Sequence, residues 1–102
     1  MAAEGVRWFN YTGADDEVPD DVTHVIVSIR VIPANAFRGH PIIVEVIFDL
    51  NVQKVERLAF HACTSLRRVI MPGVKIVEEH AFLACKALTN VECGKLEIIA
   101  FQ

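Results

Sequence analysis

Three Ala-Phe pairs recur along the chain at nearly equal intervals, and this repeat limits the folds open to it. The pairs begin at Ala36, Ala59 and Ala81, so successive copies are 23 and 22 residues apart. A fixed period of about 20–50 residues is the sequence signature of solenoids, propellers and related repeat arrays. Because one unit cannot bury its apolar face alone, stacked copies are expected to share one continuous core.

The surroundings of each Phe repeat as well. A small residue stands two positions after it (Gly39, Ala62, Ala84), and the next position holds His40, Cys63 or Cys85. Apolar residues follow at positions six, nine and eleven after the Phe: Ile43, Val46 and Phe48; Leu66, Val69 and Met71; Leu88, Val91 and Cys93. Leu96 and Ile99 restart the unit at the spacing of Val74 and Val77, but the next Ala-Phe follows at once, so the last coil is incomplete.

The apolar residues nine and eleven positions after the Phe lie two apart, and this period of two indicates a strand with one buried face. We expect strands near 43–48, 66–71 and 88–93, with Phe37, Phe60 and Phe82 stacked inside. A half-repeat with the same spacing predicts an earlier strand near 22–27. Each Ala-Phe segment suits one short helical or 3₁₀ turn.

The unit resembles the leucine-rich repeats of the bacterial surface-antigen type. The residues that carry the resemblance are the run 74–91, with its Ala-Phe-Leu-Ala-Cys centre, and weaker copies at 29–48 and 52–71. The resemblance implies an α/β leucine-rich-repeat solenoid that is right-handed and mostly β, with one parallel sheet and short turns. It also implies a surface for protein binding or adhesion, and no catalytic residues. We assign 1–21 to an N-terminal capping segment and 22–102 to the solenoid.

Two positions of each strand are expected to point away from the core, eight and ten residues after the Phe. Stacking aligns them as two columns across the sheet. The first column is His24, Glu45, Arg68 and Asn90, and the second is Ile26, Ile47, Ile70 and Glu92. An apolar stripe beside a polar column is a candidate protein contact surface. Isoleucine is also simply a residue that suits strands, so the stripe has a structural interpretation too.

Composition excludes several other classes. The chain has 102 residues and 53% hydrophobic residues, which describes one compact domain. Its formal charge of -3 argues against nucleic acid and anionic membranes as partners. The N-terminus lacks the pattern of a secretory signal, and no apolar run reaches the roughly 18 residues of a membrane span, so the cytoplasm is favoured.

Three cysteines are too few for a disulfide framework and favour a reducing compartment. Cys63 and Cys85 share a repeat position, so we expect a ladder of buried, reduced thiols, with Cys93 also in the core. His61 and His80 fall outside the core columns, which argues against a zinc site formed with these thiols. His40, in the same column as the cysteines, is expected to be a semi-buried histidine with its hydrogen bonds made.

Both ends of the chain carry unusual residues. Five acids lie between Asp15 and Asp21, but without the ordered spacing of a calcium loop, so we expect a solvated loop. Trp8, Phe9 and Tyr11 form a possible short strand that caps the first coil, with an aromatic ligand site as the alternative. The clipped last coil predicts self-association through the C-terminal end, where Phe101 lies.

Two functions stay open at this point. The first is a non-enzymatic protein-interaction module that presents the outward face of the parallel sheet to a protein partner of unknown identity. The alternative is a structural repeat, or a truncated fragment of the family, with no selected partner. No phosphate loop, nucleophile elbow or His-Glu-x-x-His motif occurs, so we expect no enzyme, no cofactor and no metal.

Overall fold

The computed structural model of the chain describes residues 5–13, 15–94 and 98–99. These residues form short β-strands joined by turns, and none of them is helical. In chain order the strands are β1 (Trp8–Tyr11), β2 (His24–Val27), β3 (Val31–Ile32), β4 (Glu45–Phe48), β5 (Lys54–Val55), β6 (Arg68–Met71), β7 (Ile76–Val77), β8 (Asn90–Cys93) and β9 (Ile98–Ile99).

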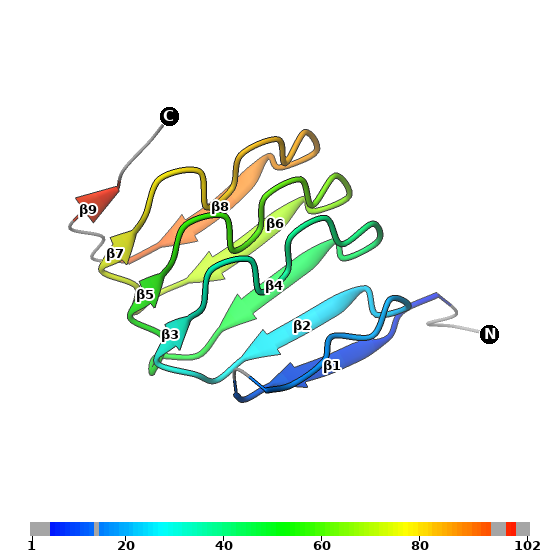
Figure 1. Ribbon diagram of the computed structural model, residues 1–102, viewed down its shortest axis with the longest axis horizontal. Coiled ribbons are helices and arrows are strands. Elements are labelled where there is room, and N and C mark those ends of the chain that lie inside the picture. Colours follow the sequence, from blue (N-terminus) through cyan, green and yellow to red (C-terminus); the bar gives the residue numbers. More distant parts are fainter. Residues whose placement is uncertain (1–4, 14, 95–97, 100–102) are drawn as a thin grey trace.

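The strands lie in two parallel sheets, and from β2 onward the chain visits them alternately (Figure 1). The first sheet has the order β1-β2-β4-β6-β8 and the second the order β3-β5-β7-β9, with every neighbouring pair parallel. The chain therefore advances by one strand in each sheet per coil, which is the architecture of a parallel β-solenoid. This confirms the predicted fold class, and β2, β4, β6 and β8 lie at the four predicted strand positions.

The core lies between the two sheets and is built from the repeated apolar positions. In β2, β4 and β6 burial alternates along the strand, so that every second side chain is in the core and the others face outward. The inward residues are at most 3% exposed: Val25, Val27, Val46, Phe48, Val69 and Met71. Period-two alternation in the sequence therefore located the buried face correctly, as expected for a strand with one face on the core.

A ladder of phenylalanine rings links the coils inside this core. The ring centroids of Phe37 and Phe60 are 4.8 Å apart, and those of Phe60 and Phe82 are 5.1 Å apart, with the planes within 6° of parallel. Phe37 and Phe60 are fully buried, whereas Phe82 is half-buried. The predicted stack is confirmed, and burying each ring contributes to stability in proportion to the apolar area removed from water.

The Ala-Phe segments form tight turns in place of the expected helical turns, and the reason is their backbone conformation. Two residues per coil have a positive φ of about +60 to +75°. The first column of such residues is Asn35, Leu58 and His80, and the second is Gly39, Ala62 and Ala84. A right-handed helical turn cannot continue through a left-handed residue. The small residue that repeats after each Phe therefore occupies a left-handed position.

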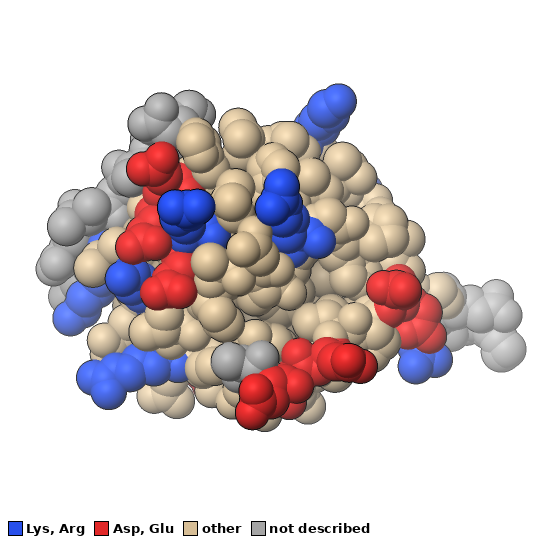
Figure 2. Space-filling model, viewed as in Figure 1, with Lys and Arg blue, Asp and Glu red and all other residues tan. Residues whose placement is uncertain are grey.

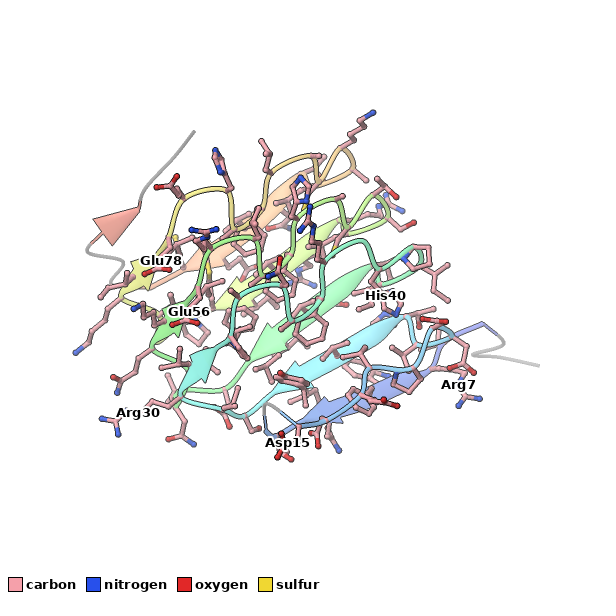
Figure 3. The ribbon with its side chains drawn as sticks, viewed as in Figure 1. Arg7, Asp15, Arg30, His40, Glu56 and Glu78 are labelled. Carbon is pink, nitrogen blue, oxygen red and sulfur yellow. The ribbon has the colours of Figure 1, made fainter. Side chains whose placement is uncertain are left out.

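Two left-handed residues of the second column donate their amides to the neighbouring coil. The N–H of Gly39 donates to the carbonyl of His61 at 2.7 Å, and the N–H of Ala62 donates to the carbonyl of Leu83 at 2.8 Å. Glutamates add a side-chain link on the second sheet, where Glu56 and Glu78 lie on successive coils (Figure 3). Each of these carboxylates accepts a backbone N–H from the coil before it, at 3.2 and 3.1 Å.

Two details differ from the sequence prediction. A second parallel sheet accompanies the expected one, and its strands are only two residues long. Cys93, predicted in the core, is exposed, because β8 is the last strand of the first sheet and all four of its residues are exposed. Ile99 pairs with Val77, as the spacing predicts. The predicted apolar surface at Phe101 lies outside the described residues.

Candidate functional site

The outward positions of the first sheet align in two columns across its five strands. Strand pairing puts His24 opposite Glu45, Glu45 opposite Arg68, and Arg68 opposite Asn90. The second column runs in the same way through Ile26, Ile47, Ile70 and Glu92. β1 adds Trp8 beside His24 and Asn10 beside Ile26. We call these ten residues the outer strip: Trp8, Asn10, His24, Ile26, Glu45, Ile47, Arg68, Ile70, Asn90 and Glu92.

Exposure differs along the outer strip. The three isoleucines are half-buried, because neighbours in the column cover part of each side chain. Trp8, at one end, is 51% exposed, and Asn90 and Glu92 at the other end are exposed. A half-exposed tryptophan on an otherwise regular sheet is notable, since tryptophan is enriched among the residues that dominate binding energy at protein interfaces.

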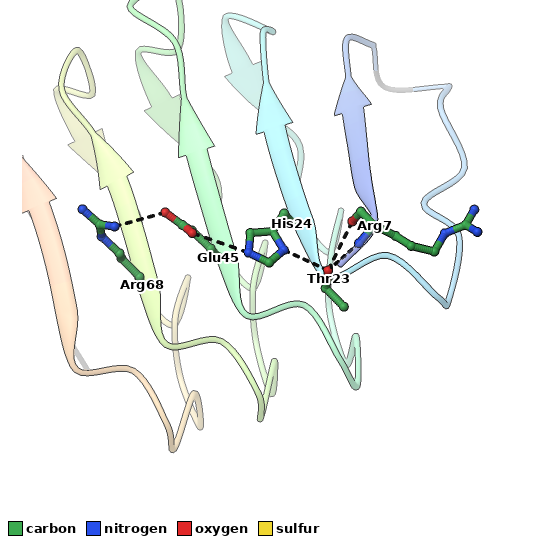
Figure 4. Close-up of polar contacts among 5 residues, drawn as sticks. All are labelled: Arg7, Thr23, His24, Glu45 and Arg68. Carbon is green, nitrogen blue, oxygen red and sulfur yellow. Dashed lines mark hydrogen bonds and ion pairs between the residues drawn. The ribbon is translucent and has the colours of Figure 1, made fainter. Parts of the chain in front are cut away.

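The polar column is connected by close contacts (Figure 4). His24 Nδ1 lies 2.8 Å from the hydroxyl of Thr23, and its Nε2 lies 3.6 Å from a carboxylate oxygen of Glu45. The Arg68 guanidinium then bridges two carboxylates, that of Glu45 at 3.4 Å and that of Glu92 at 3.0 Å. The Trp8 ring packs on the His24 ring, with 4.7 Å between centroids. This pairing of opposite charges holds Arg68 across the strip rather than extended into solvent.

The order of hydroxyl, imidazole and carboxylate along this column does not form an activated nucleophile. The Thr23 oxygen accepts the N–H of Arg7 at 2.8 Å and lies 3.3 Å from the carbonyl of the same residue (Figure 4). The hydroxyl is thus engaged in holding β1 against β2. An attacking hydroxyl must have its oxygen free to approach a substrate while a base takes its proton. The contacts of Thr23 serve the sheet.

His40 is buried, at 7% exposure, and all its polar atoms have partners. Its Nδ1 lies 3.3 and 3.2 Å from the N–H groups of Ile42 and Ile43, which can only donate, so Nδ1 accepts. Its Nε2 therefore carries the proton and donates to the carbonyl of Pro19 at 2.8 Å. The prediction of a satisfied histidine is confirmed. His40 ties the loop before β2 to the first complete coil.

The cysteine ladder is free of disulfides among the described residues, and its members differ in exposure. Cys63 is buried, as predicted, and donates to the carbonyl of Phe37 at 2.9 Å. Cys85 is half-buried and makes the matching bond to Phe60 at 3.0 Å. Contact with the Cys85 thiol, together with burial, raises the pKa of Cys63 well above its usual range. The same contact lowers the pKa of Cys85.

The remaining candidate sites stay separate in space. In the part of the chain that the structure describes, no three His, Cys, Asp or Glu side chains lie together in a way that could hold a metal ion. The acidic loop between β1 and β2 forms a shallow concavity lined by Asp16, Glu17, Val18, Pro19, Asp20 and Ala36. Figure 2 shows acidic side chains gathered along this end of the molecule.

The acidic loop also affects the buried Tyr11 of β1. Burial and the charges of Asp16 and Asp15 raise the pKa of Tyr11.

Sequence reasoning found eight of the ten outer-strip residues and missed Trp8 and Asn10. The sequence predicts that the aromatic segment is a short capping strand, or else an aromatic ligand site, and assigns it no place in the two outward columns. It carries the strand spacing of the half-repeat, since Phe9 and Tyr11 match Val25 and Val27 in the register. The two-residue spacing of Phe9 and Tyr11, which is that of Val25 and Val27, was the sequence signal for a further strand of this sheet. It would have placed Trp8 and Asn10 on the outward face of the same sheet.

This architecture, with one parallel strand per coil in each of two sheets from β2 onward, is a parallel β-solenoid and is consistent with a leucine-rich-repeat protein. The sequence model of the BspA type leucine rich repeat region matches residues 23–101 in six copies, so the chain belongs to this family. No curated protein and no solved structure matches the chain. The family supports a protein-interaction or structural repeat module. None of the described residues forms a helix long and apolar enough to cross a membrane.

Proposed function

We propose that the outer strip is a docking surface for a protein partner and that the chain works as a non-enzymatic interaction module. The observation that carries the proposal is the in-register stripe of Ile26, Ile47 and Ile70 beside a column of paired charges. An apolar centre with a polar border is the usual anatomy of a protein interface. The half-exposed Trp8 extends this surface at one end.

The side chains of the strip are also held in place, which favours binding. Glu45 and Arg68 are fixed by ion pairs, and the isoleucines are β-branched residues on paired strands. Ordering flexible side chains at an interface costs about 0.5–1.5 kcal/mol for each one. A partner that meets this face loses less of that free energy than it would on a surface of mobile lysines and glutamates.

The experiment compares two substitutions in the outer strip with one matched control. Ile47→Glu and Ile70→Glu change the outer strip, whereas Ile76→Glu changes a half-buried isoleucine on β7 in the other sheet. Each variant is immobilised and exposed to a lysate of the source cells, and the bound proteins are quantified by mass spectrometry. We expect a protein that wild type and Ile76→Glu retain and that both strip variants lose, and that then binds the purified chain directly.

The opposite result assigns the chain to the structural alternative. If no protein distinguishes the strip variants from Ile76→Glu, the isoleucine stripe has no selected partner, and its isoleucines serve only the pleated sheet. Circular dichroism of each variant establishes that the β-structure persists, so that a loss of binding reports on the surface and not on unfolding.

A further inference from the structure

We propose, on the basis of the docking function above, that the outer strip recognises an amphipathic α-helix whose apolar stripe is flanked by basic residues. The first argument is spacing. Adjacent strands of a sheet lie about 4.8 Å apart, so three isoleucines in register span about 9.6 Å. Residues i, i+3 or i+4, and i+7 of a helix span about 10.5 Å along its axis. A helix that lies across the strands thus sets one apolar residue against each isoleucine.

An extended segment fits this column less well. Its side chains on one face repeat every two residues, which is about 6.8 Å, so three of them span roughly 13.6 Å. When one such side chain is centred on Ile47, the other two lie about 2 Å beyond Ile26 and Ile70. Pairing at a strand edge would offer backbone hydrogen bonds, but the outer strip is a sheet face whose backbone groups already pair with neighbouring strands.

The second argument is charge. At pH 7 with histidine neutral, the outer strip holds two carboxylates, Glu45 and Glu92, and one guanidinium, Arg68. Because Arg68 is shared between both carboxylates, it has no unopposed positive charge to offer an acidic partner. The net negative strip, on a chain of formal charge -3, is complementary to lysine or arginine.

The size of the strip sets the expected strength. Its ten side chains are fewer than the roughly 20–30 residues a side of a standard protein interface. We therefore expect a weak complex, with a dissociation constant in the micromolar range. The bound helix is expected to be about three to four turns long. Trp8, half exposed at the end of the polar column, contacts the end of such a helix.

The test uses designed helical peptides as probes and the protein's own fluorescence as the signal. Trp8 is the single tryptophan of the chain, so peptides without tryptophan are silent. A peptide of about 18 residues exceeds the length below which isolated helices are marginal. It carries leucine at helical spacing with flanking lysines. One comparison peptide replaces the lysines by glutamates, and another keeps the lysine peptide's composition with strictly alternating leucines.

We expect saturable binding of the lysine helix, with a dissociation constant at least tenfold lower than that of the glutamate helix or of the alternating peptide. Glu45→Gln with Glu92→Gln is expected to weaken the lysine helix several-fold and to reduce the effect of added salt, because these carboxylates attract the lysines. Ile47→Thr removes apolar surface without adding charge and is expected to weaken the same complex. Ile76→Thr, in the other sheet, serves as its matched control and leaves the binding unchanged.

Equal binding of the acidic and basic helices, equal binding of the alternating peptide, or no saturable binding of the lysine helix overturns this inference. Its failure is separable from failure of the docking function. If the lysate experiment yields a partner that depends on Ile47 and Ile70 while the lysine helix does not bind, only the nature of the partner is wrong. If the strip variants affect neither experiment, both proposals are wrong.

Discussion

The left-handed turn positions give a prediction whose magnitude follows from the backbone. Ala84 has a φ of 63° and is exposed, so its methyl group contributes little burial. A left-handed conformation costs an L-residue about 1–2 kcal/mol. Glycine avoids that cost but loses about 0.4–1 kcal/mol through the greater freedom of the unfolded chain. Ala84→Gly is therefore expected to stabilise the protein by about 0.5–1 kcal/mol.

Two further variants complete the comparison. Gly39 is exposed in the same repeat position, with φ +73°, and an added Cβ meets no atom within 4 Å. Gly39→Ala thus isolates the conformational cost and should destabilise by a similar amount. Ala34 is exposed and does not have a positive φ, so Ala34→Gly should destabilise by about 0.4–1 kcal/mol.

Urea unfolding followed by circular dichroism measures all three variants. With a slope of about 1–3 kcal/mol per molar urea, the midpoint should rise by roughly 0.2–1 M for Ala84→Gly and fall by a similar amount for the other two. If Ala84→Gly lowers the midpoint as Ala34→Gly does, the backbone at position 84 is not left-handed, and the account of the turns is wrong.

Three other outcomes are expected. His40→Phe leaves the Pro19 carbonyl, the buried N–H of Ile43 and the part-buried N–H of Ile42 without a partner, and should lower the free energy of unfolding by about 1–3 kcal/mol in urea titration. A change near zero would mean that these bonds contribute little. Phe60→Leu, at 0% exposure, should cost more than Phe82→Leu at the half-buried end of the stack, and the reverse order in the same assay would contradict the stacking. Because the pKa of Cys63 is raised in the folded state, unfolded Cys63 ionises first above about pH 8.5, and the free energy of unfolding should fall by up to about 1.4 kcal/mol per pH unit above that value. Because the pKa of Cys85 is lowered in the folded state, its ionisation raises the free energy of unfolding with pH, and does so only below about pH 8.5. Cys63→Ala should therefore remove the fall in the free energy of unfolding above that pH. If this variant shows the same fall, other groups cause it.

The part of the fold that sequence could predict is the part that obeys a period. Residues nine and eleven after each Phe alternate with the outward positions, so the buried columns and both columns of the outer strip followed from counting. The second sheet was missed because a strand of two residues, such as Lys54–Val55, has no measurable alternation. Its pairing arises from the stacking of coils that the longer strands impose.

The turns were misjudged for a different reason. Leu58, Ala62 and Ala84 are poor candidates for a positive φ, and only Gly39 and, less strongly, Asn35 and His80 pointed to it. Stacking overrides the local preference here, because these turns place backbone N–H groups where they donate to carbonyls of the next coil. Cys93 was assigned by its column, but its strand β8 has a neighbouring strand on one side only and its residues are exposed.

The register of the three isoleucines supports every step from repeat to docking surface, and methyl NMR measures it directly. With isoleucine δ1 methyl groups labelled, nuclear Overhauser effects are expected between Ile26 and Ile47 and between Ile47 and Ile70, but not between Ile26 and Ile70, two strands apart. Ile76, in the other sheet, should show none to these three. A contact between Ile26 and Ile70, or no contact between neighbours, would contradict the stacked register and the outer strip with it.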